Sequence, residues 1–410
     1  MKGDRPSTRS TKTKKRVVFA TLPSNRDKQE VCPAMSLQVI RSCRRPLPKF
    51  LLNLLFCLLL VSTLVLVLIN SDSEPYTPKD YMRYSQCDII FLEVTIKPTL
   101  SPRQACSVES AAVAHPNASI CLAMSMVDYS NIAVLKPTKE QFQNLENVFV
   151  IPLNYDSIFR WTPLEHWWRE EFQFTTSIWR TIHLSDVTRL AFLWKYGGLY
   201  LDLDVIVLQP LLDLSSNFIG IQHFSSEDGV NTAVMRFERN HPFLSKWVYS
   251  VPSKFDENDR SSIGPLLVTK LIFPYCQGDL PDSKRQLKDL AGKSCDFDLR
   301  ILPPGAFYPI PWAEWKSLFK GDSSSSPADS LFKLNRSLTL HTWNEFSSRL
   351  KLNQIHDRSV FKSLAKNRCP REYYRSMAAH PTGRPMNAER LKTILKWSQR
   401  AGPNNNVLAT

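Results

Sequence analysis

The stretch Gly197-Gly-Leu-Tyr-Leu-Asp-Leu-Asp-Val-Ile-Val-Leu-Gln-Pro-Leu211 decides the fold class. It contains two short apolar runs, at residues 199–201 and 205–208, that are typical of buried strands. Asp202 and Asp204 stand between these runs. Because open α/β folds bind ligands at the carboxyl ends of their strands, the stretch predicts a polar site at one edge of a sheet.

The spacing of Asp202 and Asp204 indicates what that site binds. Side chains at positions i and i+2 of a regular strand point the same way, so we expect both carboxylates to approach one divalent cation. Oxygen ligands suit Mn²⁺ or Mg²⁺, and such an ion stabilises the negative charge that grows on a leaving diphosphate. A bare Asp-x-Asp is also a common polar turn, but the Gly-Gly-aromatic sequence before it and the apolar run after it favour a metal site.

Residues 183–196, just before this stretch, predict an amphipathic helix. Apolar residues recur there at helical spacing, Ser185 is suited to cap the start, and Gly197-Gly198 is suited to end it. Asp186 and Arg189 are spaced i,i+3 and therefore share one face of the helix. They are either a solvated ion pair, worth roughly a few tenths of a kcal/mol, or a pair with a function beside the aspartates.

Strand-like and helix-like segments alternate along residues 88–237. Short apolar runs predict strands, and one longer segment predicts a further helix. The predicted strands are Asp88–Leu92, Ile120–Met126, Asn147–Ile151, Phe218–Ile221 and Ala233–Phe237, and the predicted helix is Arg103–His115. Alternation of this kind predicts an α/β fold with a mainly parallel sheet flanked by helices.

Residues 50–69 have the composition of a membrane anchor. This apolar run of 20 residues carries no charge and is long enough for about 30 Å of helix, which crosses a bilayer. Basic residues precede it and acidic residues follow it, so the positive-inside rule places the N-terminus in the cytoplasm and the rest of the chain in the lumen. A cleaved signal peptide is the alternative, but the segment before the run is too long and no small-x-small cleavage site follows.

The other boundaries follow from composition. Residues 1–49 predict a disordered cytosolic tail, 70–86 a polar stem, 87–380 one lumenal domain and 381–410 a C-terminal extension. The first 50 residues hold 13 Lys or Arg against three acidic residues, so +10 of the net charge of +14 belongs to the tail. This distribution argues against nucleic acid as a partner of the folded domain.

Cysteine usage and two sequons agree with a lumenal domain. Six cysteines follow the apolar run, an even number that permits three disulfides in an oxidising compartment, in 15 different pairings. They are Cys87, Cys106, Cys121, Cys276, Cys295 and Cys369. Asn117-Ala-Ser and Asn335-Arg-Ser are candidate N-glycosylation sites.

Leu184–Leu208, which contains the Asp-x-Asp motif, resembles the core of the GT-A glycosyltransferases of the alpha-1,4-glycosyltransferase family, which includes the lactosylceramide 4-alpha-galactosyltransferases. Further segments resemble the same family, in the expected order over roughly residues 85–372. These segments are Phe91-Leu-Glu-Val-Thr95, Arg103–Ala112, Thr162-Pro-Leu, Gly264–Thr269, Phe307–Ile310 and His341-Thr-Trp-Asn344. The resemblance is therefore specific and covers most of the predicted lumenal domain.

The resemblance implies a GT-A-like mixed sheet flanked by helices, in a type II protein of the Golgi membrane. The implied reaction is a retaining transfer of galactose from UDP-galactose, in alpha-1,4 linkage, to a glycosphingolipid such as lactosylceramide. The implied cofactor is Mn²⁺ or Mg²⁺. Retention is compatible with a covalent intermediate or with front-face attack, and we assign no catalytic nucleophile from the sequence.

The resemblance also implies roles for particular residues of this chain. These roles are donor-sugar binding for Asp186 and Arg189, metal and diphosphate binding for Asp202, Asp204, His341 and Asn344, and nucleotide binding for Phe91, Glu93 and Thr95.

Three alternative functions stay open. The oligomeric state also stays open, and a homodimer is one possibility. An alpha-1,4-N-acetylgalactosaminyl- or N-acetylglucosaminyltransferase would use the same linkage on a glycolipid or a glycoprotein glycan. An aspartyl-phosphatase also has Asp-x-Asp after an apolar strand, but it expects Thr or Val where Ile206 stands. A catalytically inactive sugar-binding protein is the third, and the intact Asp202–Asp204 motif with Asp186 and Arg189 argues against it.

Overall fold

The computed structural model describes residues 53, 58–62, 84–129, 131–224, 229–276, 286–321, 334–351 and 354–378. The chain divides into two units, Met1–Pro75 and Tyr76–Thr410, and the described residues from 84 onward belong to the second. The predicted tail, most of the predicted anchor and stem, and the C-terminal extension lie outside the described residues. Among the residues that are described, none of the helices combines the length and the apolar composition that a membrane span requires.

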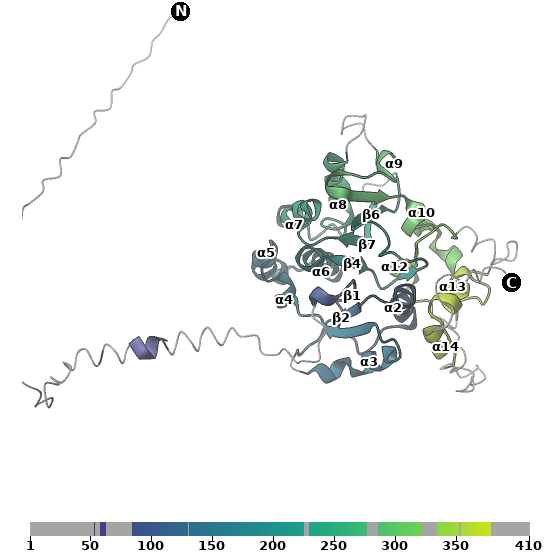
Figure 1. Ribbon diagram of the computed structural model, residues 1–410, viewed down its shortest axis with the longest axis horizontal. Helices are drawn as coiled ribbons and strands as arrows, with labels where there is room; N and C mark the ends of the chain where they lie inside the picture. The colour runs from purple at the N-terminus through teal and green to yellow at the C-terminus, as the bar shows by residue number, and fades with distance from the viewer. Residues whose placement is uncertain are drawn as a thin grey trace, which may run out of the picture. The chain divides into compact units, whose positions relative to one another are not determined.

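A mixed sheet of seven strands forms the centre of the second unit (Figure 1). Its strands, in spatial order, are β3 Val148–Pro152, β2 Ile120–Met124, β1 Ile89–Glu93, β4 Gly198–Leu201, β7 Val230–Phe237, β6 Asn217–Ile221 and β8 Leu299–Leu302. The first four run parallel to one another, β7 runs antiparallel to β4 and β6, and β8 is parallel to β6. The predicted α/β class with a largely parallel sheet is confirmed.

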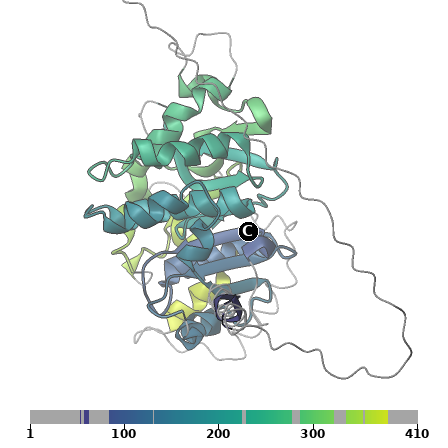
Figure 2. The same cartoon turned by 90° about the vertical axis from the view of Figure 1, so that its left-hand side faces the viewer.

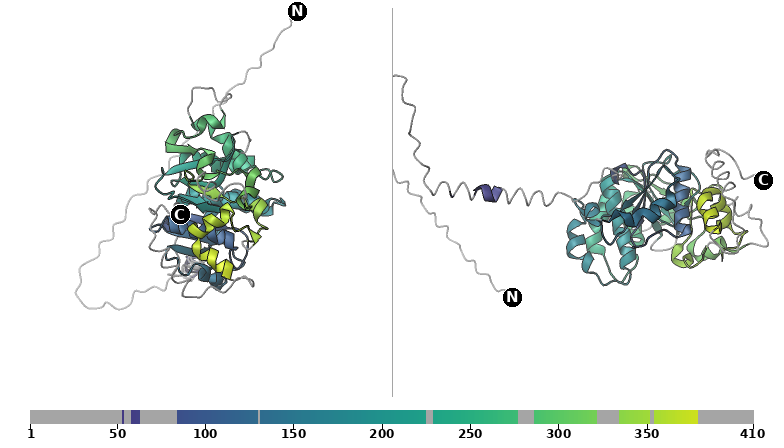
Figure 3. Two further views of the ribbon diagram at one scale, coloured as in Figure 1. Left: turned by 90° about the vertical axis from the view of Figure 1, so that its right-hand side faces the viewer. Right: turned by 90° about the horizontal axis from the view of Figure 1, so that it is seen from below.

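Helices cover both faces of this sheet. The α-helices described in this unit are α2 Pro102–Ala114, α3 Lys136–Phe142, α4 Tyr155–Phe159, α5 Glu165–Glu170, α6 Arg180–Tyr196, α7 Pro242–Lys254, α8 Pro265–Leu271, α9 Leu287–Leu290, α10 Pro304–Phe307, α12 Asn344–Ser347, α13 Val360–Arg368 and α14 Pro370–Ala378. Helices α6 and α7 lie over one face, which is turned to the viewer in Figure 2. Helices α2, α13 and α14 lie over the other, as the left panel of Figure 3 shows.

Strand β1 shows how the sequence fills two cores at once. Successive side chains of a strand point to opposite faces, so Ile89 and Phe91 join the core under α2, while Ile90 and Leu92 join the core under α6. All four are nearly or fully buried. A strand buried on both faces reads as a continuous apolar run, which is why this segment was recognisable from the sequence.

Helix α6 begins earlier than the sequence predicts. Its first residue is Arg180 and its N-cap is Trp179, which makes no side-chain capping bond, so the prediction that Ser185 caps the helix is wrong. Ser185 lies within the helix, and its hydroxyl accepts a hydrogen bond from Arg189 at 2.7 Å. The predicted end is correct, since Gly197 adopts φ +73° and a Cβ there would lie 2.9 Å from a backbone nitrogen.

The chain leaves the main sheet directly after β4. Strand β5, Val205–Val207, pairs instead with β9, Thr339–His341, in a separate two-stranded antiparallel sheet. The register places Val205 opposite His341. This pairing brings a C-terminal segment beside Asp204 and so assembles the polar site from distant parts of the chain.

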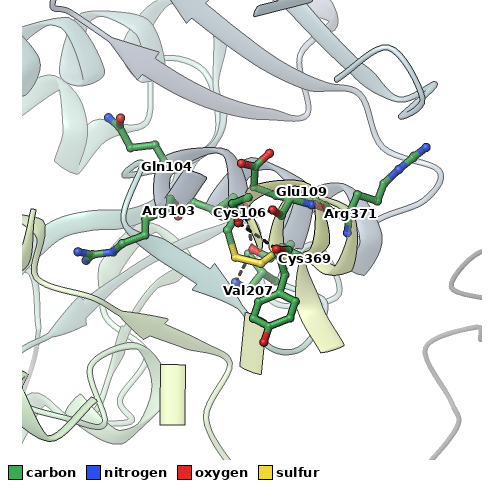
Figure 4. The surroundings of a disulfide bond; sticks show 12 residues. Arg103, Gln104, Cys106, Glu109, Val207, Cys369 and Arg371 are labelled. Carbon is green, nitrogen blue, oxygen red and sulfur yellow. Dashed lines mark hydrogen bonds between the residues drawn. A yellow bond between two sulfur atoms is a disulfide. The ribbon is translucent and has the colours of Figure 1, made fainter. Parts of the chain in front are cut away.

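Three disulfides connect the six cysteines of this unit, as Cys87–Cys121, Cys106–Cys369 and Cys276–Cys295. The second joins α2 to the residue just before α14, across 263 positions of sequence, and is drawn in Figure 4. Glu109, also on α2, accepts hydrogen bonds from the backbone N–H groups of Arg371 and Glu372 in the first turn of α14. A covalent bond and a buried carboxylate thus fix the last described helix to α2.

Candidate metal centre

The Asp202–Asp204 motif forms a turn and not a strand. Strand β4 ends at Leu201, the N–H of Asp202 donates to the carbonyl of Ala233 at 2.9 Å, and the N–H of Val205 donates back to Asp202 at 3.1 Å. The two carboxylates therefore converge through a turn between two sheets, which corrects the strand alternation expected from the sequence.

Asp202, Asp204 and His341 lie close enough to share one cation. Each offers one ligand atom, and these three atoms all lie within 4.8 Å of one another. Neighbouring ligands of an octahedral ion bound at 2.0–2.1 Å are about 3 Å apart, so small side-chain movements suffice to close the set. Two carboxylate oxygens and an imidazole nitrogen suit Mn²⁺ well, since its preferred ligands are carboxylates and imidazole favours transition metals.

Asp204 and His341 form a buried ion pair. Nε2 of His341 lies 3.2 Å from Oδ1 of Asp204. Burial by itself raises the pKa of Asp204, but His341 and the backbone N–H of Asn344 outweigh it, so the pKa of Asp204 is lowered. Burial likewise lowers the pKa of His341, and the charge of Asp204 outweighs it, so the pKa of His341 is raised.

The segment after β9 holds Asp204 in place. Thr342 donates to the carbonyl of Asp204 through its N–H at 2.8 Å and its hydroxyl at 3.1 Å. The N–H of Asn344 donates to Oδ2 of Asp204 at 2.8 Å, whereas the side-chain oxygen of Asn344 accepts from Arg103 at 2.6 Å. His341 therefore contacts Asp204 through its side chain, whereas Asn344 contacts Asp204 through its backbone N–H.

Asp186 and Arg189 are buried beside the same turn. Their side chains are only 6% and 7% exposed, so the solvated surface pair considered from the sequence is wrong. NH1 of Arg189 lies 3.0 Å from Asp202, and NH2 lies 3.4 Å from Asp186. Burial raises the pKa of Asp186, and Arg189 opposes that rise in part.

The guanidinium of Arg189 is well supplied with acceptors. Nε donates to the carbonyl of Ser185 and NH2 to its hydroxyl, while NH1 donates to the carbonyl and hydroxyl of Thr232. With the ion pairs to Asp202 and Asp186 included, each of the three guanidinium nitrogens of Arg189 has at least one partner. Arg189 therefore lies between the carboxylates of Asp186 and Asp202 and contacts both of them.

Asp186 also packs against Gly264. A Cβ at position 264 would lie 2.5 Å from Oδ2 of Asp186, closer than real Cβ atoms approach. Gly264 immediately precedes α8, so the glycine lets the chain pass directly over the Asp186 carboxylate.

The residues predicted to bind a nucleotide differ in their accessibility. Phe91 is fully buried in the core, and its role in nucleotide binding stays a prediction. The carboxylate of Glu93 accepts hydrogen bonds from Thr95 and Gln104 and pairs with Lys97 at 2.7 Å. Thr95 is exposed and lies two residues after β1.

Both sequon asparagines, Asn117 and Asn335, are exposed and lie in turns, as glycosylation requires.

Two residues near the aspartates were not singled out from the sequence. The hydroxyl of Tyr200 donates to Asp202 at 2.5 Å, and Arg103 on α2 reaches the segment that holds Asp204. Tyr200 stands inside the quoted motif, where its strand position could have indicated a contact. Arg103 gives no such signal, because its partners are more than 230 positions away.

Comparison with known proteins agrees with this site. Residues 101–225 match the region described as "Glycosyltransferase sugar-binding region containing DXD motif", and residues 236–376 match the "Alpha 1,4-glycosyltransferase conserved region". The first region contains the aspartates and the second contains His341. The fold and the site thus define a DxD-containing glycosyltransferase.

Curated relatives specify the family. Lactosylceramide 4-alpha-galactosyltransferase of Mus musculus is 33% identical over 287 residues, and that of Rattus norvegicus 34% over 280, each covering 66% of this chain and 73% of the relative. Alpha-1,4-N-acetylglucosaminyltransferase of Homo sapiens is 29% identical over 302 residues, which are 72% of this chain and 82% of the relative. The chain belongs to the alpha-1,4-glycosyltransferase family.

Proposed function

We propose that this protein transfers galactose from UDP-galactose, with retention and in alpha-1,4 linkage, to a glycosphingolipid such as lactosylceramide. The observation that carries the metal-dependent part is the convergence of Asp202, Asp204 and His341 within 4.8 Å, next to the buried Asp186–Arg189 pair. The sugar and acceptor are supported by the two rodent relatives, which are named for this reaction.

The residues present fit a divalent cation, with Mn²⁺ as the favoured ion. When bound, the cation supplies positive charge that stabilises the departing diphosphate. Asp204 would be held for this task by Thr342, Asn344 and His341, and Asp202 by Arg189 and Tyr200. A fixed array of this kind needs no reorganisation when charge develops, which is the main source of electrostatic catalysis.

Asp186 would hold the donor sugar. An ionised carboxylate only accepts hydrogen bonds, so it recognises a hydroxyl donor of the hexose. Its place on the rigid helix α6, one turn from Arg189, fixes it relative to Asp202. The residue that binds the donor sugar and the residue that binds the metal and diphosphate would therefore be linked through Arg189.

Transfer of N-acetylglucosamine is the second candidate, because one relative in Homo sapiens is named for that sugar with the same linkage. The proposed setting of either reaction is the Golgi lumen, with residues 50–69 as a type II anchor. The sequence of basic tail, apolar run and polar stem supports this topology.

Donor and acceptor profiling of the full-length protein tests the proposal. The protein in detergent micelles with Mn²⁺ is given UDP-galactose, UDP-N-acetylgalactosamine or UDP-N-acetylglucosamine, each with lactosylceramide and with a free N-acetyllactosamine glycan. The proposal expects a product from UDP-galactose and lactosylceramide with a terminal alpha-1,4-galactose by linkage analysis. Preferential use of UDP-N-acetylglucosamine supports the second candidate, and no turnover of any donor contradicts both.

A further inference from the structure

Arg103 is a buried cation that lies behind the aspartate site. It stands on α2 and is only 6% exposed, with its guanidinium over the rings of Phe319 and Phe361 at 4.7 and 5.6 Å from their centres. Burial lowers the pKa of Arg103 to about 10, and the charge of Asp204 opposes that shift. The side chain therefore remains charged at neutral pH.

The hydrogen bonds of Arg103 all reach one segment, residues 342–350. NH1 donates to the carbonyl of Ser347 at 2.5 Å and to that of Leu350 at 3.5 Å. NH2 donates to the side chains of Asn344 at 2.6 Å, Ser347 at 2.5 Å and Thr342 at 3.4 Å. One side chain thus fixes most of a turn.

That same segment is the part of the chain that holds Asp204. Thr342 binds the Asp204 carbonyl twice, and the N–H of Asn344 binds its carboxylate. Ser347 adds a further bond by donating to the carbonyl of Thr342 at 2.7 Å. Arg103 therefore binds Thr342 and Asn344, which bind Asp204 directly, and Ser347, which binds Thr342.

Helix α2 gives Arg103 a rigid base. Ser101 and Gln104 form a reciprocal capping box at the start of the helix, and Cys106 joins α2 to Cys369. Figure 4 shows the Arg103 side chain extending from α2 away from this disulfide. The guanidinium is therefore held from both sides, by its own helix and by the turn that it binds.

We propose that Arg103 is the positioning residue of the metal centre, which orients Asp204 and His341 for a divalent cation through the 342–350 segment. The inference rests on the proposed function, since it concerns the same site. Arg103 would act through its neighbours, because none of its described hydrogen bonds goes directly to Asp204 or His341. The planar fork of arginine can bind several acceptors in one geometry, which the single ammonium of lysine cannot reproduce.

Arg236 is a matched control. It is also a partly buried arginine whose pKa is lowered by burial, and its guanidinium donates to two carbonyls, those of Leu212 and Leu214. Arg236 pairs with Leu199 and therefore lies toward the start of β4, whereas the aspartates follow its end. Loss of Arg236 should cost stability without affecting the metal centre.

Calorimetric titration of Mn²⁺ into the full-length protein, without sugar nucleotide, tests the inference. Arg103→Gln and Arg103→Lys should both weaken Mn²⁺ binding by about 10- to 100-fold, as loss of groups that orient metal ligands usually does. Arg236→Gln should lower the thermal unfolding midpoint and leave Mn²⁺ affinity within about twofold of wild type.

Ser347→Ala keeps the test decisive if Arg103→Gln does not fold. It removes one acceptor of Arg103 and should weaken Mn²⁺ binding in the same direction by a smaller factor. Wild-type Mn²⁺ affinity in Arg103→Lys and Ser347→Ala would overturn the positioning role and leave the proposed function standing. If the wild-type protein itself binds no Mn²⁺, the proposed metal dependence fails, and the inference fails with it.

Discussion

Nε2 of His341 lies 3.2 Å from Oδ1 of Asp204, although the two residues are far apart in the sequence. The pairing of β5 with β9 produces this contact. Since Asp204 raises the pKa of His341, the imidazole of the metal-free protein keeps its proton to a higher pH than an ordinary histidine does. A metal ligand must be a neutral imidazole, so metal binding has to release that proton.

Mn²⁺ affinity should therefore rise with pH. The pKa of His341 is raised and that of Asp204 is lowered, so of these two groups it is His341 whose proton competes with the metal ion. Affinity should increase by about tenfold per pH unit below the pKa of His341 and level off above it. Calorimetric titration of Mn²⁺ at a series of pH values measures this dependence. The His341→Gln variant should bind Mn²⁺ weakly, with an affinity that does not change with pH in this way. A flat profile in the wild-type protein would remove His341 from the ligand set.

Asp186→Asn should separate sugar recognition from nucleotide recognition. Hydrogen bonds to charged groups are worth about 1.5–3 kcal/mol, so kcat/KM for the UDP-sugar should fall roughly 10- to 150-fold. Binding of UDP itself with Mn²⁺ should change little, because the proposed role of this carboxylate is to bind the sugar and not the nucleotide. Kinetics and UDP calorimetry on one preparation check both statements, and equal losses of UDP and UDP-sugar affinity would refute the assignment.

Much of the site was predictable from sequence because its residues lie in short, regular patterns. The apolar strands, the helix before Gly197 and both aspartates follow from local spacing. The burial of Phe91 and the extra turn of α6 before His183 depend on tertiary packing, which local patterns do not contain. Arg103 was unpredictable for the same reason, since its partners become neighbours only when β9 pairs with β5.

Gly264→Ala should imitate the loss of Asp186. The new Cβ would meet the Asp186 carboxylate at 2.5 Å and displace it. We expect a fall in kcat/KM of at least about tenfold with UDP binding retained. Gly305→Ala is the control, because a Cβ there meets no atom within 4 Å, and it should leave kinetics unchanged. Normal turnover of Gly264→Ala would show that Asp186 tolerates displacement.

The proposed membrane topology predicts a protease pattern. In sealed microsomes, protease added outside should remove only the N-terminal tail, because residues after the apolar run 50–69 would be lumenal. Immunoblotting with an antibody against the folded domain detects the protected fragment. Digestion of that domain in intact vesicles would show that it lies on the cytoplasmic side and would contradict the proposed topology.

The most direct test of the central claim is turnover of UDP-galactose on lactosylceramide as a function of free Mn²⁺, with the wild-type protein and Asp204→Asn. Saturable dependence on Mn²⁺ is expected for the wild type, with activity lost in EDTA and restored by the ion. Asp204→Asn should lose at least about 100-fold in kcat, since its carboxylate joins His341 and Asp202 at the metal centre. Full turnover in EDTA, or near-normal turnover by a folded Asp204→Asn protein, would contradict the account.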